Sequence, residues 1–409
     1  MRRFALALAG VAACATALRL PYLTGRSLWY DEASSWQTAS FPLSELMGSV
    51  RLNVHVPLYY VLLKGWMAAL GDSVAALRGF SIALGVLTVV AMGLLGRELA
   101  RASGAVDPAD EAEGRRFGLF LAALTAASPF QVYASIEARM YSLGTALSAL
   151  SAWLLLRILR RGGRSRLWWG YGASCAALLY THHYALFTVA APFLFLALYG
   201  AWLLGVGDRD GLRAIAGRAA LVGLALAVIY LPGLDLLRAQ TGRVRQDYWI
   251  EPLDWRTFAA TFADFAVTGA DDPTREPWGW AVLAVVAGSC LVVAAACRRG
   301  DGLMLASALT PPLLAAAVSM VQPIWVARYF RFAQLFLLAV VATAIWRITR
   351  RRPTARAAIV ALTLAGLLAG DVAFWRSLDI RNNPGLRGAV EAAVAGAGPG
   401  EAIVALDLF

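Results

Sequence analysis

The stretch ALRGFSIALGVLTVVAMGLLG, residues 76–96, decides the fold class of this chain, because it is apolar for long enough to cross a membrane. A helix needs about 20 predominantly apolar residues to span about 30 Å of hydrocarbon. The chain as a whole is 59% hydrophobic and 15% charged, whereas soluble domains carry about 25% charged residues. Backbone groups in lipid must be hydrogen bonded within their own segment, so helices are the expected structure.

Blocks of the same kind recur along the sequence. We therefore predict an all-α, polytopic membrane protein with about eleven transmembrane helices. The predicted spans are residues 4–23, 76–96, 117–135, 141–159, 167–181, 185–204, 216–235, 278–297, 303–321, 330–347 and 356–374.

The distribution of basic residues predicts the orientation of these spans. More than half of the 37 Lys and Arg fall in short loops on one side, namely 2–3, 97–116, 157–166, 209–218, 298–299 and 347–356. Because basic loops stay in the cytoplasm, we predict a cell (inner or plasma) membrane protein with a cytoplasmic amino terminus and an extracytoplasmic carboxyl terminus. The predicted outer segments are 24–75, 136–141, 182–184, 236–277, 322–329 and 375–409. The net charge of +11 is thus explained by topology and not by nucleic-acid binding.

The two long outer loops contain apolar or amphipathic pieces at 43–52, 57–70 and 253–265, which predict helices at the membrane interface. The polar tail at 376–409 predicts a helix, a turn and a buried strand, AIVALDLF. We therefore divide the chain into a transmembrane domain, residues 1–375, and a small α/β-like extracytoplasmic tail. The tail is either a truncated soluble domain or a segment that packs on the membrane domain.

Asp31 and Glu32, in SLWYDEASSW, lie just beyond the first predicted span. Aromatic neighbours surround the pair with apolar surface, which is a setting in which a carboxylate serves as a general base. Two alternatives stay open: a divalent cation held by one or both carboxylates, and a pair of solvated loop acids.

The three histidines, His55, His182 and His183, all fall on the predicted outer side. Their spacing fits no familiar zinc signature, so zinc is the less favoured interpretation. His55 precedes an apolar stretch that contains Lys64. A contact with phosphate or sugar and a plain interfacial position both remain open for His55.

Glu137, Arg139 and Tyr141 form a charged element at a predicted helix end, and Arg328 and Tyr329 precede the tenth predicted span. Charges at membrane depth are costly unless they are paired or functional. Arginine is permanently charged and binds phosphate in a bidentate manner, so both arginines are candidates for contacts with a lipid phosphate. Structural pairing of the glutamate and snorkelling of Arg328 are the alternatives.

Together these residues resemble the GT-C superfamily of membrane glycosyltransferases, in particular the bacterial branch related to protein O-mannosyltransferases and to the lipid A aminoarabinose transferase. The stretches that carry the resemblance are LWYDEASSW, VHVPLYYVLLKGW, GDSVAALRGFSIALGVLTVV, GREL, SPFQVYASIEARMYSLGTALSAL, LLYTHHYALF and ARYFRFAQLFLLAV. In order and spacing they cover residues 20–350 approximately. The combination is specific for the family and not for a substrate.

The resemblance implies an inverting transfer of a sugar from a polyprenyl-phosphate donor to an extracytoplasmic glycolipid, cell-wall glycan or protein. By position, Asp31 matches the catalytic acid of the family's Asp-Glu motif, and Glu32 matches its partner. The residues expected to bind substrate are His55, Tyr59, Lys64, Glu137, Arg139, Tyr141, His182, His183, Arg328 and Tyr329. His55 stands where relatives have His or Lys before Pro-Pro-Leu, but Val56 replaces the first of those prolines. Relatives also carry a longer outer carboxyl-terminal domain.

Two other functions remain as alternatives. A flippase or transporter of lipid-linked sugars predicts charged residues at the middle of the bilayer and paired broken helices. A non-catalytic scaffold or receptor predicts that Asp31→Asn is tolerated.

Overall fold

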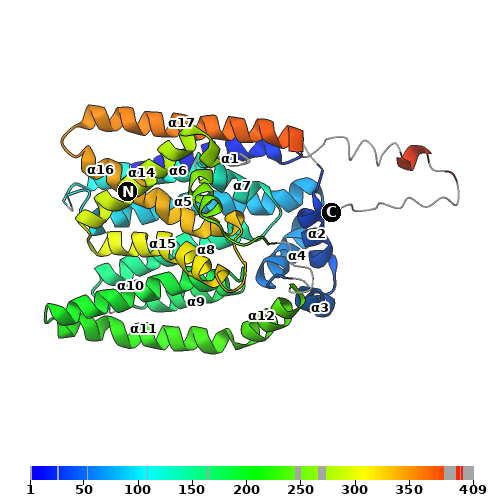
Figure 1. The fold of residues 1–409 in the computed structure, drawn as a ribbon, viewed down its shortest axis with the longest axis horizontal. Coiled ribbons are helices and arrows are strands. Elements are labelled where there is room, and N and C mark those ends of the chain that lie inside the picture. The colour runs from blue at the N-terminus through cyan, green and yellow to red at the C-terminus, as the bar shows by residue number, and fades with distance from the viewer. Residues whose placement is uncertain are drawn as a thin grey trace.

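The computed structural model describes residues 2–24, 27–52, 54–107, 109–163, 165–244, 250–265, 273–381, 393–396 and 398. Long helices run side by side in one bundle, and several of the short helices gather at one end of it (Figure 1). The long helices are α1 (Arg2–Arg19), α5 (Val74–Ala102), α6 (Glu111–Ala126), α8 (Tyr141–Arg160), α10 (Ala185–Gly205), α11 (Arg209–Ile229), α14 (Pro277–Ala295), α15 (Arg299–Ser319), α16 (Arg331–Ile348) and α17 (Pro353–Arg381). The shorter elements are η1 (Leu20–Tyr22), α2 (Tyr30–Ser40), α3 (Leu43–Leu52), α4 (Leu58–Leu70), α7 (Pro129–Ile136), α9 (Leu167–Leu179), α12 (Leu231–Val244), α13 (Trp255–Asp264), η2 (Pro273–Arg275) and η3 (Ala327–Phe330).

The described residues confirm the all-α, multi-span prediction and revise the number of spans. Nine of their helices are long and apolar enough to cross a membrane, and the bent pair α6–α7 makes a tenth if its two parts form one span. The predicted count of eleven exceeds this because the segment at 167–181 forms α9, which has 13 residues. At about 1.5 Å per residue such a helix reaches about 20 Å, which is short of the about 30 Å of a hydrocarbon core.

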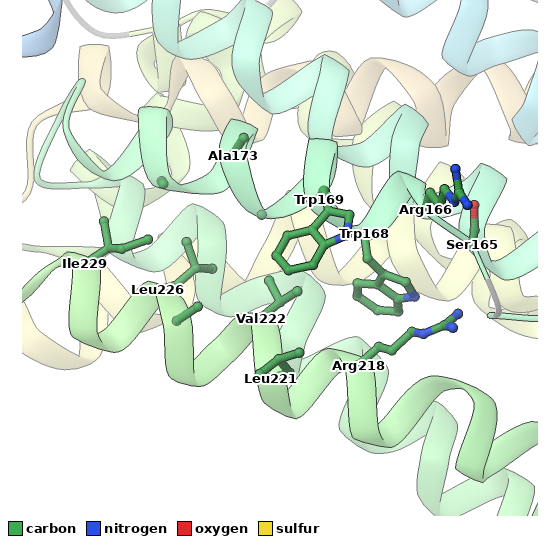
Figure 2. A pocket seen from close by; sticks show the side chains of 13 residues that line it. Ser165, Arg166, Trp168, Trp169, Ala173, Arg218, Leu221, Val222, Leu226 and Ile229 are labelled. Atoms are coloured by element: carbon green, nitrogen blue, oxygen red, sulfur yellow. The ribbon is translucent and has the colours of Figure 1, made fainter.

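A groove lies beside the short helix α9. It has a volume of about 560 Å³ and is bounded by α9 and α11. Figure 2 shows the Trp168 and Trp169 rings and the Val222 and Leu226 side chains around it, with the Arg218 guanidinium near one end. The Trp168 indole donates a hydrogen bond of 2.8 Å to the carbonyl oxygen of Gly163, which ties the start of α9 to the preceding turn.

The span predicted at 117–135 is bent by 61° between α6 and α7. Pro129 is the first residue of α7, and proline favours the first position of a new helix because it has no N–H to donate. The bend carries Ser135 against α5, where a Cβ added to Gly85 would clash with its side chain. The Ser135 hydroxyl in turn accepts a 2.6 Å hydrogen bond from Arg19 at the end of α1.

Helices α5 and α8 run through the bundle in the same direction. Near their first turns, the Ser81 hydroxyl donates to the carbonyl oxygen of Arg139 at 3.5 Å. Near their last turns, Arg157 and Glu98 lie 3.9 Å apart. The bundle therefore has two distinct ends, which we call the Asp31 end, where α2, α3 and α4 gather (Figure 1), and the Arg157 end. Which end faces the cytoplasm stays a prediction from charge.

The three predicted interfacial pieces are helical in the structure. The pieces at 43–52, 57–70 and 253–265 correspond to α3, α4 and α13. The described residues contain no β-strand. The strand predicted in the tail, AIVALDLF at 402–409, lies outside the described residues.

Candidate active site

Glu32 is held by donors from three segments. Its carboxylate accepts hydrogen bonds of 2.9 and 2.7 Å from Arg78 near the start of α5, and 3.1 Å from the backbone N–H of Ala138. The backbone N–H of Trp29 caps the same group at 3.4 Å. Neither side chain of the Glu32–Arg78 pair is exposed to solvent. The pair therefore fixes the start of α2, and with it the position of Asp31.

Asp31 presents its carboxylate between two arginines. Oδ2 lies 3.8 Å from Arg139 and 3.7 Å from Arg328, and the Asp31 side chain is 19% exposed. Within the described residues this carboxylate accepts no hydrogen bond, because Arg139 donates instead to the Asp31 carbonyl oxygen at 3.1 Å. Of the two adjacent acids, only Asp31 has an oxygen free to accept a proton or to contact a substrate.

His55 holds Arg139 in place. The Arg139 Nη2 donates to His55 Nε2 at 2.7 Å. A guanidinium has only donors, so this histidine nitrogen is the acceptor and the ring is neutral. Burial and the neighbouring charge of Arg139 hold the pKa of the His55 imidazole well below its usual value. His55 therefore positions a cation and does not supply one to a phosphate.

Gln240 of α12 joins three segments around His55. Its amide nitrogen donates to the carbonyl oxygens of Val50 and His55 at 2.8 and 2.9 Å. Its amide oxygen lies 2.6 Å from Nε2 of His183. Because an amide oxygen can only accept a hydrogen bond, Nε2 of His183 is the donor. His183 thus supports the backbone of His55. The sequence gives no sign of Gln240, since it lies in a polar stretch of a predicted loop.

His182 belongs to an aromatic wall. Its ring centre lies 4.8 Å from that of Tyr329 and 5.9 Å from that of Tyr141. The backbone N–H of Tyr184 donates to His182 Nδ1 at 3.1 Å. Burial, followed by the charges of His183 and the nearby arginines, lowers the pKa of His182 well below its usual value. A neutral, aromatic surface at this place suits contact with a sugar ring better than with a phosphate.

Glu137 pairs with an arginine that the sequence alone does not single out. Arg331, the first residue of α16, lies 3.2 Å from the Glu137 carboxylate, and the two side chains are 0% and 1% exposed. The Arg331 guanidinium also stacks 4.3 Å from the ring centres of Tyr133 and Tyr141. Glu137 therefore makes a structural ion pair, which was the alternative to a contact with substrate. Arg331 resembles any helix-terminal arginine in sequence, so only the fold reveals it.

Two of the predicted substrate contacts serve structural bonds. The Lys64 ammonium donates to the carbonyl oxygens of Ala39 and Phe41, at 3.3 and 2.8 Å, where α2 ends. The Tyr59 hydroxyl is 3.1 Å from that of Ser81, and Tyr59 is fully buried.

Tyr60, next to Tyr59 in the chain, lies close enough to Arg139 and Asp31 for their charges to affect its pKa. Burial raises the pKa of Tyr60, while Arg139 lowers it and Asp31 raises it.

Arg328 is the more exposed of the two arginines beside Asp31, with 29% of its side chain exposed, and it lies 5.8 Å from the ring centre of Trp29. Of the two arginines, Arg328 is therefore the more accessible to solvent.

The donor set around the two acids does not fit a divalent cation. Both Glu32 oxygens already accept from Arg78, and Asp31 faces two further guanidinium groups. Such positive charge opposes a bound cation. In the part of the chain that the structure describes, no three His, Cys, Asp or Glu side chains form a group that could hold a metal.

The described residues form a multi-span helical membrane protein with a cluster of acids, arginines and histidines at one end of its bundle. By sequence, no protein family and no curated protein matches the chain. By structure, it is similar to ArnT from Cupriavidus metallidurans in the apo state, with a TM-score of 0.52 and 15% identity over 85% of this chain and 60% of that chain. It is also similar to the S. cerevisiae protein O-mannosyltransferase Pmt1–Pmt2 complex bound to the sugar donor, with a TM-score of 0.40 and 18% identity over 66% of this chain and 37% of that chain.

The likeness to ArnT, with a TM-score of 0.52, confirms the predicted resemblance at the level of the fold. At 15% identity the agreement concerns the fold and not the activity. The chain spans 60% of the length of ArnT.

Proposed function

We propose that this protein is an inverting glycosyltransferase, which moves a sugar from a polyprenyl-phosphate donor to an acceptor on the extracytoplasmic side of the membrane. The observation that carries the proposal is the Asp31 carboxylate, which no described residue hydrogen bonds and which lies between Arg139 and Arg328. A base beside two permanent cations is the pairing that transfer from a sugar phosphate requires.

In the proposed reaction, the acceptor hydroxyl attacks the anomeric carbon from the face opposite the phosphate. Its proton passes to Asp31, the bond between the anomeric carbon and the phosphate oxygen breaks, and the electron pair leaves with the phosphate. Arg139 and Arg328 offset the charge of the leaving phosphate. When the donor phosphate binds, it competes with Asp31 for these two guanidinium groups, which frees the carboxylate to accept the proton.

The structure favours this function over transport of lipid-linked sugars. A transporter of the repeat type predicts two broken helices in corresponding halves, and the described residues contain one bent pair, α6–α7. The charged groups of the site also gather at one end of the bundle. Transport remains the alternative function, and the following experiment distinguishes it from sugar transfer.

The test compares Asp31→Asn with Asp235→Asn, a control whose side chain is 65% exposed. Purified variants in lipid are given a panel of polyprenyl-phosphate sugars, and sugar transfer and donor binding are measured separately. Asp31→Asn should lower turnover about 100-fold or more and leave donor binding nearly intact, whereas the control should keep both.

Arg139→Gln should instead weaken donor binding, because a charged contact with the phosphate is lost. Near-normal turnover of Asp31→Asn together with normal donor affinity of Arg139→Gln would rule out this active site. Mass spectrometry of glycolipids and glycoproteins from cells with and without the gene would identify the sugar and the acceptor.

A further inference from the structure

A second polar site lies at the Arg157 end of the bundle, away from Asp31. A cavity of about 750 Å³ opens among α5, α6, α8 and α15. Five arginines line it, namely Arg97, Arg101, Arg157, Arg160 and Arg299. Facing them are two acids, Glu98 and Glu111.

The acids offset only part of the positive charge. Glu111 pairs with Arg97 at 3.3 Å and with Arg101, and Glu98 pairs with Arg160 at 2.9 Å. Five guanidinium groups against two carboxylates leave a formal excess of three positive charges in the cavity. An excess of this size at close quarters is unfavourable unless an anion shares the site.

The arginines also retain unused hydrogen-bond donors. The Nε atoms of Arg97 and Arg157 are buried and have no hydrogen-bond partner among the described residues. Nε of Arg157 lies 3.9 Å from Glu98, which is too far for a hydrogen bond. Several guanidinium groups around one hollow match the oxygens of a phosphate.

The cavity joins a charged rim to an apolar wall. Leu94 and Trp153 line it together with the arginines, and the Arg157 guanidinium lies 4.9 Å from the ring centre of Trp153. Four of the five arginines stand near the carboxyl ends of α5 and α8, where two candidate spans end, and Arg299 is the first residue of α15. Aromatic and basic residues at a span end mark the depth of lipid headgroups.

The helix ends alone account for part of this arrangement. Arginines near the last turn of a helix stabilise its terminal carbonyl groups, so one cation per helix needs no ligand. Two arginines from α5, two from α8 and one from α15 around the same hollow exceed that requirement.

We propose that this cavity binds the phosphate of an anionic phospholipid headgroup. The arginines contact the phosphate oxygens, while Leu94 and Trp153 contact the glycerol and the first carbons of the acyl chains. Basic pockets between transmembrane helices bind lipid phosphates in this way. The site is separate from the Asp31 end and does not depend on the proposed reaction.

The test uses the full chain in detergent, titrated with phosphatidylglycerol or phosphatidylcholine and, in a separate arm, with inorganic phosphate. Native mass spectrometry measures the bound fraction. Phosphatidylglycerol should bind preferentially, and Arg157→Gln should reduce its affinity about tenfold, as expected for a lost hydrogen bond to a charged group. Arg213→Gln is the control, because that side chain is 77% exposed and lies outside the cavity.

A second variant distinguishes ligand binding from a purely structural network. Glu111→Gln removes a carboxylate that competes for the arginines, so it should strengthen binding of phosphatidylglycerol even if it lowers the unfolding temperature. Equal binding of the two lipids, or unchanged binding in both Arg157→Gln and Glu111→Gln, would overturn the proposal. Saturation by inorganic phosphate without any lipid preference would also overturn it, and would assign the cavity to the free anion.

Discussion

Replacing Glu32 with Gln tests whether Glu32 stabilises the fold while the adjacent Asp31 acts in the chemistry. The substitution removes the negative charge from a pair in which both side chains are 0% exposed. Arg78 keeps its charge and loses its partner, and one amide N–H of the new residue points at a guanidinium donor. Loss of one partner from a buried ion pair costs about 3–5 kcal/mol. A protein is stable by about 5–15 kcal/mol, so a large fall in unfolding temperature is expected.

The double variant Glu32→Leu/Arg78→Met makes this prediction specific. Replacing a buried pair with apolar side chains of similar volume is nearly neutral or stabilising, but leucine at position 32 also leaves the backbone N–H groups of Ala138 and Trp29 without their acceptor. The double variant should therefore recover only part of the stability that Glu32→Gln loses. Thermal unfolding in detergent measures both variants, and turnover per folded molecule is measured alongside. If Glu32→Gln is as stable as the parent chain but its turnover falls about 100-fold, as is expected for Asp31→Asn, then Glu32 acts in the chemistry and our reasoning is refuted.

Three further outcomes are expected. Burial and Arg139 hold the pKa of His55 well below its usual value of 6.5, so at lower pH the unfolded chain binds a proton at His55 that the folded chain does not. The contribution of His55 to stability is therefore fully present above about pH 6.5 and falls by up to about 1.4 kcal/mol per pH unit below it. His182, whose pKa is lowered in the same way, adds to this pH dependence. His55→Gln should therefore make the slope shallower in thermal unfolding curves without removing it, and an unchanged slope would contradict the assignment. In a chain whose four cysteines are replaced by serine, Asp72→Cys and Arg116→Cys should label from opposite sides of the membrane, and labelling from one side would refute the orientation. Removing residues 382–409 should alter acceptor use or stability before it alters donor hydrolysis. A folded deletion variant that no longer hydrolyses the donor would disprove this.

The helices were largely predictable because membrane spans are a local property. A block of about 20 apolar residues identifies itself without its neighbours, and α8, α10 and α16 begin and end within one or two residues of the prediction. The short helix α9 and the bend before Pro129 depend on where a helix stops, which hydropathy alone does not show. Helix boundaries are the least reliable part of any such prediction.

The site was predictable in its acids and much less so in their partners. Asp31, Glu32 and Glu137 stand out because acids are rare beside apolar blocks. Their partners lie far along the chain, with Arg78 contributed by α5 and Arg331 by α16. Both look like ordinary arginines near a helix start. The sequence contains no signal for a pairing between helices, because that pairing is created by packing.

The charge of a histidine, like the pairing of these arginines, could not be predicted from the sequence. A histidine before an apolar stretch left a contact with phosphate or sugar open, and the fold makes His55 the acceptor for Arg139. Whether an imidazole is charged depends on neighbours that only the folded chain brings together.

Helix α5 carries a fixed spacing between its charged ends. Arg78 and Glu98, each bound to partners on other segments, are twenty positions apart in the sequence, and at about 1.5 Å per residue this separates them by about 30 Å. That length equals the hydrocarbon thickness of a typical bilayer. Neither end can slide into lipid without drawing a charge with it, so a mismatched bilayer must deform around the protein or tilt it. We expect activity in vesicles of graded acyl-chain length to peak near this thickness, and a flat response would show that α5 imposes no such match.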